Sequence, residues 1–354
     1  MKKILLTFIL ITGCVMMTPA QTFEEVEGAF TTFADDLSAA LPFASTLGLN
    51  WSDSYIGQFP HLGVGMSVGA VGLPAEAFGA VLGAMTGGAA DADLLSFLPA
   101  ELQPYLDQFG MPFPSAVAEA RIGGFALPFD IGLKVGLIPD QVDLGSVLPA
   151  GLAIDYLVYG ADVRFKLIEE KGLIPELSVG GGYNYLSGGV AFQTQDPISI
   201  GGFEVPDPAN PTETLYYDIN LSAPELRFNW ETSVFDVKAQ ISKKILFITP
   251  YLGIGATFGT SRVNGGAFTT VSTTPALTEQ EWEDLAAALA TLGEEVPQLT
   301  PEGFLISSEA ANGFATRAFG GLSLNLLFLK LDVSGFYEIV SQSLGASVGL
   351  RLQF

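Results

Sequence analysis

The last forty residues, Ala315 to Phe354, read ATRAFGGLSLNLLFLKLDVSGFYEIVSQSLGASVGLRLQF. They hold three runs in which every second residue is apolar, namely 318–326, 329–339 and 344–354. A period of two is typical of β-strands with one apolar and one polar face. Because ionised residues such as Lys330, Asp332 and Arg351 lie on the polar face, the pattern favours a transmembrane β-barrel, whose outer face meets lipid and whose inner face meets a polar lumen.

The same alternation recurs upstream. Seven further runs show it: 62–70, 116–123, 129–137, 156–166, 176–185, 235–242 and 251–258. We therefore predict an all-β fold, a transmembrane antiparallel up-and-down β-barrel of about ten strands, with a range of about eight to twelve, formed by residues 44–354. The segment from Leu47 to Trp51 also alternates and is a possible short strand of uncertain placement.

Long and short connections alternate along the chain. The long ones are 72–114, 188–226 and 264–312, which we expect to be external loops, partly helical, with a helix from Glu279 to Leu292. Outer-membrane barrels have short periplasmic turns and long external loops, and this arrangement puts Phe354 at the periplasmic end.

The composition combines a net charge of −23 with a mean hydropathy of +0.41, which excludes a disordered acidic chain. Residues 1–20 have the pattern of a secretory signal peptide, with Lys2 and Lys3 before an apolar run and cleavage expected after Ala20. Since Cys14 ends a lipobox-like stretch, a lipidated N-terminus is the alternative. Export together with amphipathic strands predicts the bacterial outer membrane.

Residues 21–43 are predicted to form an amphipathic helix, with Thr22 and Glu25 as a capping box. Its apolar stripe is made by Phe23, Val26, Phe30, Phe33 and Leu37. Two placements are open. The helix can be a plug in the mouth or lumen of the barrel, or it can pack beneath the periplasmic rim.

Charged residues share the face that the barrel turns inward. The predicted lumenal set is Glu119, Arg121, Asp130, Lys134, Asp162, Arg164, Lys166, Glu176, Asp236, Lys238, Arg317, Lys330, Asp332, Glu338 and Arg351. Unpaired buried charges are costly, so these side chains should pair across strands or meet water. A barrel of about ten strands is narrow, and we expect a salt-bridged interior with little open pore.

The three long connections contain no Lys or Arg but carry 19 Asp and Glu residues. Such a field would attract cations to the mouth, although it can equally serve to keep an exposed surface soluble. Nucleic-acid binding is disfavoured by the same charge. The sole histidine, His61, has no nucleophile and carboxylate beside it in the predicted topology, and no metal or cofactor motif is present, so we expect no enzyme activity, metal or cofactor.

Several short stretches resemble a family of treponemal, or spirochaetal, outer-membrane β-barrel proteins of largely unknown function. They are LGLNWSDSYI (47–56), AEARIGG (118–124), DIGLKVG (130–136), YLSGG (185–189) and ITPYLGIG (248–255). The resemblance implies a location in the outer membrane more than an activity.

Two functions fit these observations. The first is a porin-like, non-enzymatic barrel that passes small solutes, is possibly cation-favouring, and is gated by the N-terminal helix or the loops. The alternative is a surface adhesin or structural barrel with a closed lumen, whose acidic loops bind a ligand. In both, the outward residues Leu350, Leu352 and Phe354 would form the C-terminal signal for the barrel-assembly machinery, and outer-membrane lipid would surround the chain.

Overall fold

The fold is described from a computed structural model. It describes residues 23–53, 61–73, 110–124, 127–138, 152–193, 198–206, 214–274, 303–308 and 313–354. The predicted signal peptide, the residue Thr22 and the predicted helix at 279–292 lie outside these ranges.

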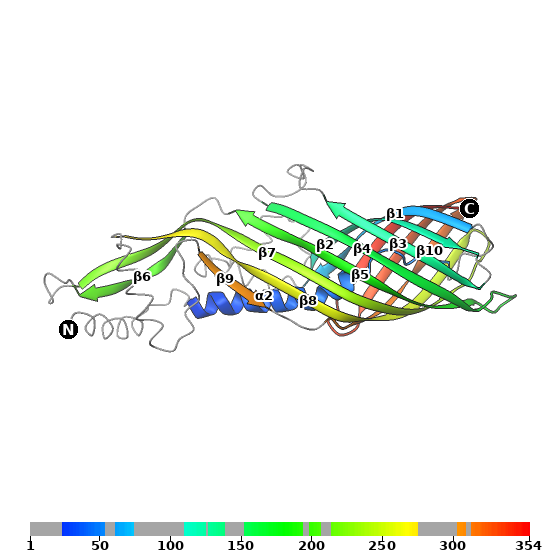
Figure 1. Ribbon diagram of the computed structural model, residues 1–354, viewed down its shortest axis with the longest axis horizontal. Coiled ribbons are helices and arrows are strands. Elements are labelled where there is room, and N and C mark those ends of the chain that lie inside the picture. Colours follow the sequence, from blue (N-terminus) through cyan, green and yellow to red (C-terminus); the bar gives the residue numbers. More distant parts are fainter. Residues whose placement is uncertain are drawn as a thin grey trace.

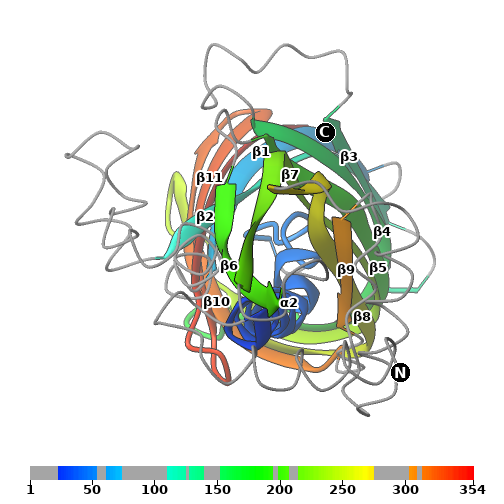
Figure 2. The ribbon, with the colours of Figure 1, turned by 90° about the vertical axis from the view of Figure 1, so that its left-hand side faces the viewer.

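Ten antiparallel strands form a closed ring (Figures 1 and 2). They are β1 (His61–Leu73), β2 (Met111–Gly123), β3 (Phe129–Ile138), β4 (Leu152–Ile168), β5 (Glu176–Gln193), β7 (Thr214–Ser242), β8 (Ile248–Thr274), β10 (Ala315–Leu326), β11 (Leu329–Glu338) and β12 (Leu344–Gln353). The first and last strands pair through Val64 and Leu352, and the pairing of β7 with β8 completes the circle. The predicted ten-stranded barrel is thus confirmed.

Two predicted loops contain strands, which is a correction: most of 188–226 is strand, and 264–312 includes strand at 264–274 and 303–308. Strands β5 and β7 pair as far as Gln193 and Glu225, and β8 continues to Thr274, so that 188–226 and 264–312 are not simple loops. Two further strands, β6 (Ile198–Pro206) and β9 (Gly303–Ser308), pair with the far parts of β7 and β8. Figure 1 shows this sheet running past the ring. These stretches are not predicted as strands because their sequences lack the apolar alternation found in the ring.

The connections divide the barrel into two ends. We define the short-turn end by the turns 124–128, 169–175, 243–247 and 327–328 together with Phe354, and the long-loop end as the opposite one. At the long-loop end, one connection is short, the five residues between β11 and β12. The strict alternation expected from the sequence therefore fails at this turn.

The outer face of the ring is apolar. Along β1, Leu62, Val64, Met66 and Val68 are exposed, whereas Gly63 is buried on the inner side. Because the side chains of a strand alternate, this places the period-two apolar residues outside and their polar neighbours in the lumen. Among the described residues, no helix is long and apolar enough to cross a membrane.

One helix, α2 (Phe23–Ala44), packs against β8, β9 and β7: it starts beside the sheet that runs past the ring and ends within the ring (Figures 1 and 2). It occupies the long-loop end, away from the C-terminus (Figure 1). After Ala44 the chain continues through the lumen as far as Asp53, and β1 then begins at the short-turn end. The segment from Leu47 to Trp51 is therefore no strand of the barrel. Its alternation arises because it is a turn packed within the lumen.

Candidate functional site: the occupied lumen

The lumen has an apolar part and a charged part. The apolar part lies around the helix and is formed by the inward side chains near the long-loop end: Val71, Leu73, Phe113, Tyr156, Val158, Leu186, Phe228, Trp230 and Val263. Burial of apolar surface is the main force that holds a helix against such a wall. The apolar stripe of the helix thus faces the apolar part of the wall.

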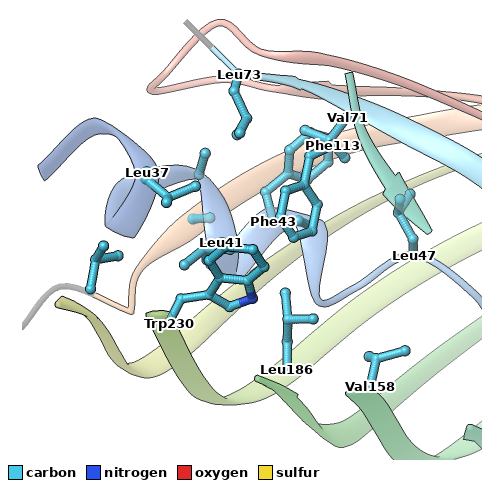
Figure 3. Packing of buried hydrophobic residues seen from close by; sticks show 14 of the residues in the cluster. Leu37, Leu41, Phe43, Leu47, Val71, Leu73, Phe113, Val158, Leu186 and Trp230 are labelled. Atoms are coloured by element: carbon cyan, nitrogen blue, oxygen red, sulfur yellow. The ribbon is translucent and has the colours of Figure 1, made fainter. Parts of the chain in front are cut away.

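The stripe of α2 packs against this wall. Phe30 and Phe33 lie on Phe228, with ring centroids 5.4 Å and 4.6 Å away. Leu37 and Leu41 are buried, and Figure 3 shows Leu41 and Phe43 among Val71, Phe113 and Trp230. The side chains of Phe23 and Val26 lie outside the described set. Of the two placements left open by the sequence, the structure has the helix at the mouth of the barrel, with its C-terminal end in the lumen.

The helix ends at Ala44, and the nine residues that follow, 45–53, form what we term the lumen segment. Gly48 and Leu49 both have positive φ, 87° and 57°, and the chain bends at Gly48. A Cβ on Gly48 would lie 2.8 Å from Cγ2 of Val117, so a larger residue would collide with β2 as well as strain the turn. The turn thus fits the wall closely at this point.

Wall side chains donate hydrogen bonds to the backbone carbonyls of the lumen segment. The Lys134 ammonium binds the carbonyls of Ser45 and Leu47 at 2.7 Å and 2.6 Å. Lys238 donates to Leu49, at 3.2 Å, and the Gln240 amide to Trp51, at 2.7 Å. Since α2 has no basic residue in its last turn, Lys134 also supplies the positive charge that a helix C-terminus favours.

The end of the lumen segment is held by ion pairs. The carboxylate of Asp53 lies 2.7 Å from Lys330 and 2.8 Å from Arg351, and its carbonyl accepts a hydrogen bond of 2.6 Å from Arg164. The Trp51 indole donates to Glu119, and the Arg351 guanidinium lies 4.6 Å from the centre of the Trp51 ring. Side chains from five different strands therefore converge on 51–53.

The remaining wall charges pair with one another. Arg121 bridges Asp130 at 2.5 Å and Asp162 at 2.7 Å. The other close pairs are Arg164–Asp130, Lys238–Asp162, Arg317–Asp236 and Arg351–Asp332, all at 2.7 Å or 2.8 Å. Breaking one side of such a buried pair is costly because it leaves the other charge uncompensated. The network thus makes the charged part of the lumen rigid.

Twelve of the fifteen residues expected in the lumen are buried. They are Glu119, Arg121, Asp130, Lys134, Asp162, Arg164, Asp236, Lys238, Arg317, Asp332, Glu338 and Arg351. Lys166, Glu176 and Lys330 lie nearer the short-turn end and are partly exposed. Lys166 pairs with the exposed Glu169 at 3.4 Å, outside the network. Glu338 instead accepts a hydrogen bond from the backbone of Thr316, at 2.9 Å.

Little space remains between the lumen segment and the wall. A cavity lined by Asn50, Trp51, Glu119, Asp332 and Arg351 holds about 20 Å³. This is room for about one water molecule. The lumen is occupied here rather than open.

Trp51 and Asp53, which make several of these contacts, are absent from the lumenal set predicted from the sequence. One signal was available. The fifteen predicted lumenal residues comprise eight basic and seven acidic side chains, so a further acid was needed to balance a buried network. Asp53 supplies this charge, but it lies outside the strands, so the alternation of strand faces does not predict its position.

Within the described ranges, no three His, Cys, Asp or Glu side chains are grouped so that they could hold a metal ion. His61 lies at the start of β1, with Nε2 3.4 Å from Nε2 of Gln353. The outward residues Leu350, Leu352 and Phe354 are exposed, and Phe354 stacks on Phe328 with centroids 6.1 Å apart.

No protein-family model and no curated protein matches this chain. Solved structures similar to it include the translocator domain of the autotransporter NalP from Neisseria meningitidis, with a TM-score of 0.36 and 10% identity over 92% of this chain and 99% of the other. The outer membrane protease OmpT from Escherichia coli gives a TM-score of 0.36 with 9% identity, covering 83% and 96%. The Ralstonia pickettii toluene transporter TbuX gives 0.28 with 8% identity, covering 90% and 94%. Likeness at this level carries no argument about function.

Proposed function

We propose that this chain is a non-enzymatic outer-membrane β-barrel that passes small solutes when its N-terminal segment, residues 23–53, leaves the lumen. The observation that supports the proposal best is the way in which the wall binds the segment that fills the lumen. The lumen segment is bound through its own backbone carbonyls and through Asp53, and it is no part of the wall.

A permanently closed barrel of this size can fill its interior with wall side chains. Here several inward positions beside the lumen segment are glycines, and Gly63 leaves the room that the Trp51 ring occupies. A wall with this shape would leave a polar, charge-lined passage if the segment moved out. The segment 23–53 contributes no strand to the wall and leads into it only after Asp53. It can therefore move without breaking the pairing between strands.

The ion preference of the passage would arise at its mouth. The wall carries nearly balanced charge, whereas the connections at the long-loop end carry the excess of Asp and Glu. We propose that these acidic connections raise the local cation concentration, an effect that falls as salt rises.

Planar-bilayer conductance tests this function. We expect the mature chain to be mostly silent, and a variant lacking 21–53 to show steady, weakly cation-selective current. A variant lacking only 21–28 is the matched control. It keeps Phe30 and everything that packs beyond it, and it should stay silent. If the 21–53 deletion folds, as judged by heat-modifiable gel migration, and still passes no current, the proposal is wrong.

The closed structural or adhesive barrel is the second candidate. The observation that favours it is the sheet of β6, β7, β8 and β9, which runs past the ring at the long-loop end and could present a binding surface (Figure 1). Cell-surface binding that is lost when this sheet is trimmed, together with a silent 21–53 deletion, would favour this alternative over a channel.

The assembly of the barrel is proposed to depend on its last strand. Leu350, Leu352 and Phe354 present an apolar face that ends on an aromatic residue, the form that we expect the barrel-assembly machinery to bind. The replacement Phe354→Ser should lower the amount of folded barrel in the outer membrane without changing the amount exported.

A further inference from the structure

Each of the four hairpin turns at the short-turn end has an exposed leucine, which lies at the tip in 169–175, 243–247 and 327–328 and next to the start of β3 in 124–128. These rim leucines, Leu127, Leu173, Leu246 and Leu327, are 63%, 96%, 84% and 91% exposed. Tight turns usually carry Gly, Asn, Asp, Ser or Pro, which suit the backbone and meet water well. Four exposed leucines at one end of the barrel therefore call for a contact outside this chain.

Two rim leucines also have an unfavourable backbone. Leu246 and Leu327 have φ of 55° and 58°, in the left-handed region that Gly and Asn adopt more easily than a bulky residue. At the opposite end of the barrel, the left-handed residue of the turn between β11 and β12 is polar, Gln342, with φ 58°. The left-handed position is thus apolar in these two short-turn-end turns and polar in the β11–β12 turn, which exposes Ile339 and Val340 elsewhere.

The rim leucines continue the lipid-facing surface of the barrel. Strand β11 has ten residues, close to the roughly 9–11 that a tilted strand needs to cross a membrane. Its outward residues are apolar from Leu331 to Tyr337, and Phe328 in the adjoining turn is half-exposed. In this turn no polar residue separates the apolar band from Leu327, whereas Glu169 to Lys171 precede Leu173, and Lys243 and Lys244 precede Leu246.

Basic side chains accompany the tips. Lys171 and Lys244 are exposed beside Leu173 and Leu246, while Lys243 lies 3.1 Å from Glu170. Partial burial alone would raise the pKa of Glu170, but hydrogen bonds from the Lys244 N–H and the Lys243 ammonium hold it below the ordinary value. Glu170 thus stays ionised and neutralises Lys243, leaving Lys171 and Lys244 at the depth where lysines meet lipid headgroups.

We propose that the rim leucines insert into the acyl region of the phospholipid leaflet on the short-turn side, so that this rim is a lipid-binding surface. This inference rests on the proposed membrane location and goes further, since most of a barrel's turns could project into water. The occupant is phospholipid, because at Leu327 the rim joins the apolar band without a break, and at Leu173 and Leu246 exposed lysines lie beside the apolar tips.

Replacing Leu246 and Leu327 by Asn gives a sharp test, because Asn relieves the backbone while it removes the apolar side chain. In phosphatidylcholine vesicles, urea titration should show the folded-to-unfolded ratio falling about tenfold for each leucine. The matched control is Gln342→Asn, which makes the same backbone change at the other end and should leave the ratio unchanged. Equal or higher stability of the two Leu→Asn variants would overturn the proposal.

A second measurement does not depend on stability. The only cysteine of the chain is Cys14, in the predicted signal peptide, so Leu246→Cys and Leu327→Cys would each give a single labelling site in the mature protein. A fluorophore there should be quenched by nitroxide-labelled lipid and protected from aqueous iodide. Quenching by iodide alone in a folded, inserted barrel would mean that the rim faces water or a soluble partner, and only this inference would fail. If no folded barrel forms in vesicles, the membrane location itself fails.

Discussion

At the scale of single residues, we expect Asp53 to contribute most to the binding of the lumen segment by the wall. It pairs with Lys330 and Arg351, which come from neighbouring strands β11 and β12. Its side chain is 20% exposed, so water weakens the pairs to some extent. Loss of this carboxylate would leave Arg351, itself almost fully buried, with only Asp332 as an acidic partner among the ion pairs found.

We expect Asp53→Asn to loosen the lumen segment. Removing one partner of a fully buried pair costs about 3–5 kcal/mol, and for this partly exposed group we expect about 2 kcal/mol, or roughly a thirtyfold rise in open probability. Single-channel recording measures that probability. The control is Glu169→Gln, which removes the exposed pair with Lys166 and should change nothing. An unchanged open probability in Asp53→Asn would argue against plugging by this segment.

A glycine on the wall supplies a second test. A Cβ on Gly63 would lie 2.5 Å from the Trp51 ring, so Gly63→Val should push Trp51 away from Glu119 while the strand pairing stays intact. We expect more frequent openings and a red shift in tryptophan emission. Gly335→Val is the control, since nothing lies within 4 Å of a Cβ there. Identical behaviour of the two variants would show that the contact between Trp51 and the wall is unimportant.

The lumenal charges show what can be inferred from sequence at this scale. An alternating strand assigns each residue to one face, and for this reason the positions of Arg121, Asp130 and Arg164 follow directly from the pattern. The partners of those charges do not follow, because pairing depends on the stagger between strands. Asp53 could not be located at all, since it lies on no strand and belongs to no periodic pattern.

At the scale of elements, the N-terminal helix and the lumen segment act together. The stripe of α2 is visible in the sequence, but its location is not, because an apolar stripe fits a rim and a lumen equally well. The structure resolves this through the apolar collar around Phe228 and Trp230, whose side chains face inward although most other inward positions are polar. The predicted strands are shorter than long strands such as β7, because the outer parts of these strands lack the apolar alternation.

The direction of α2 leads to a labelling prediction. Gly28 is exposed near the start of the helix, and a Cβ there would have nothing within 4 Å, so Gly28→Cys should be tolerated. A membrane-impermeant maleimide should label this site in intact cells, because α2 begins at the long-loop end. Ser45→Cys, at a position that is fully buried, should react only after unfolding. Prompt labelling of Ser45→Cys in the folded protein would contradict the burial of the lumen segment.

At the scale of the whole molecule, one closed wall serves three surroundings. Its outer face is apolar, its inner face binds the N-terminal segment, and its short-turn rim exposes leucines. The closed ring was predictable because the part of each strand within the ring alternates with a period of two, and counting these runs gives ten strands; the alternation of long and short connections fails between β11 and β12. The occupation of the lumen could not be predicted, because it depends on one short non-periodic stretch, 45–53.

The central claim is that residues 23–53 thread the barrel from the long-loop end to the short-turn end. Pulsed electron–electron spin distance measurements on the mature protein in lipid test it most directly, with one label at Gly28→Cys and the second at either Gln342→Cys or Gly172→Cys. We predict a narrow distribution for both pairs, with 28 nearer to 342 than to 172. A broad distribution, or 28 lying nearer to 172, would contradict the account.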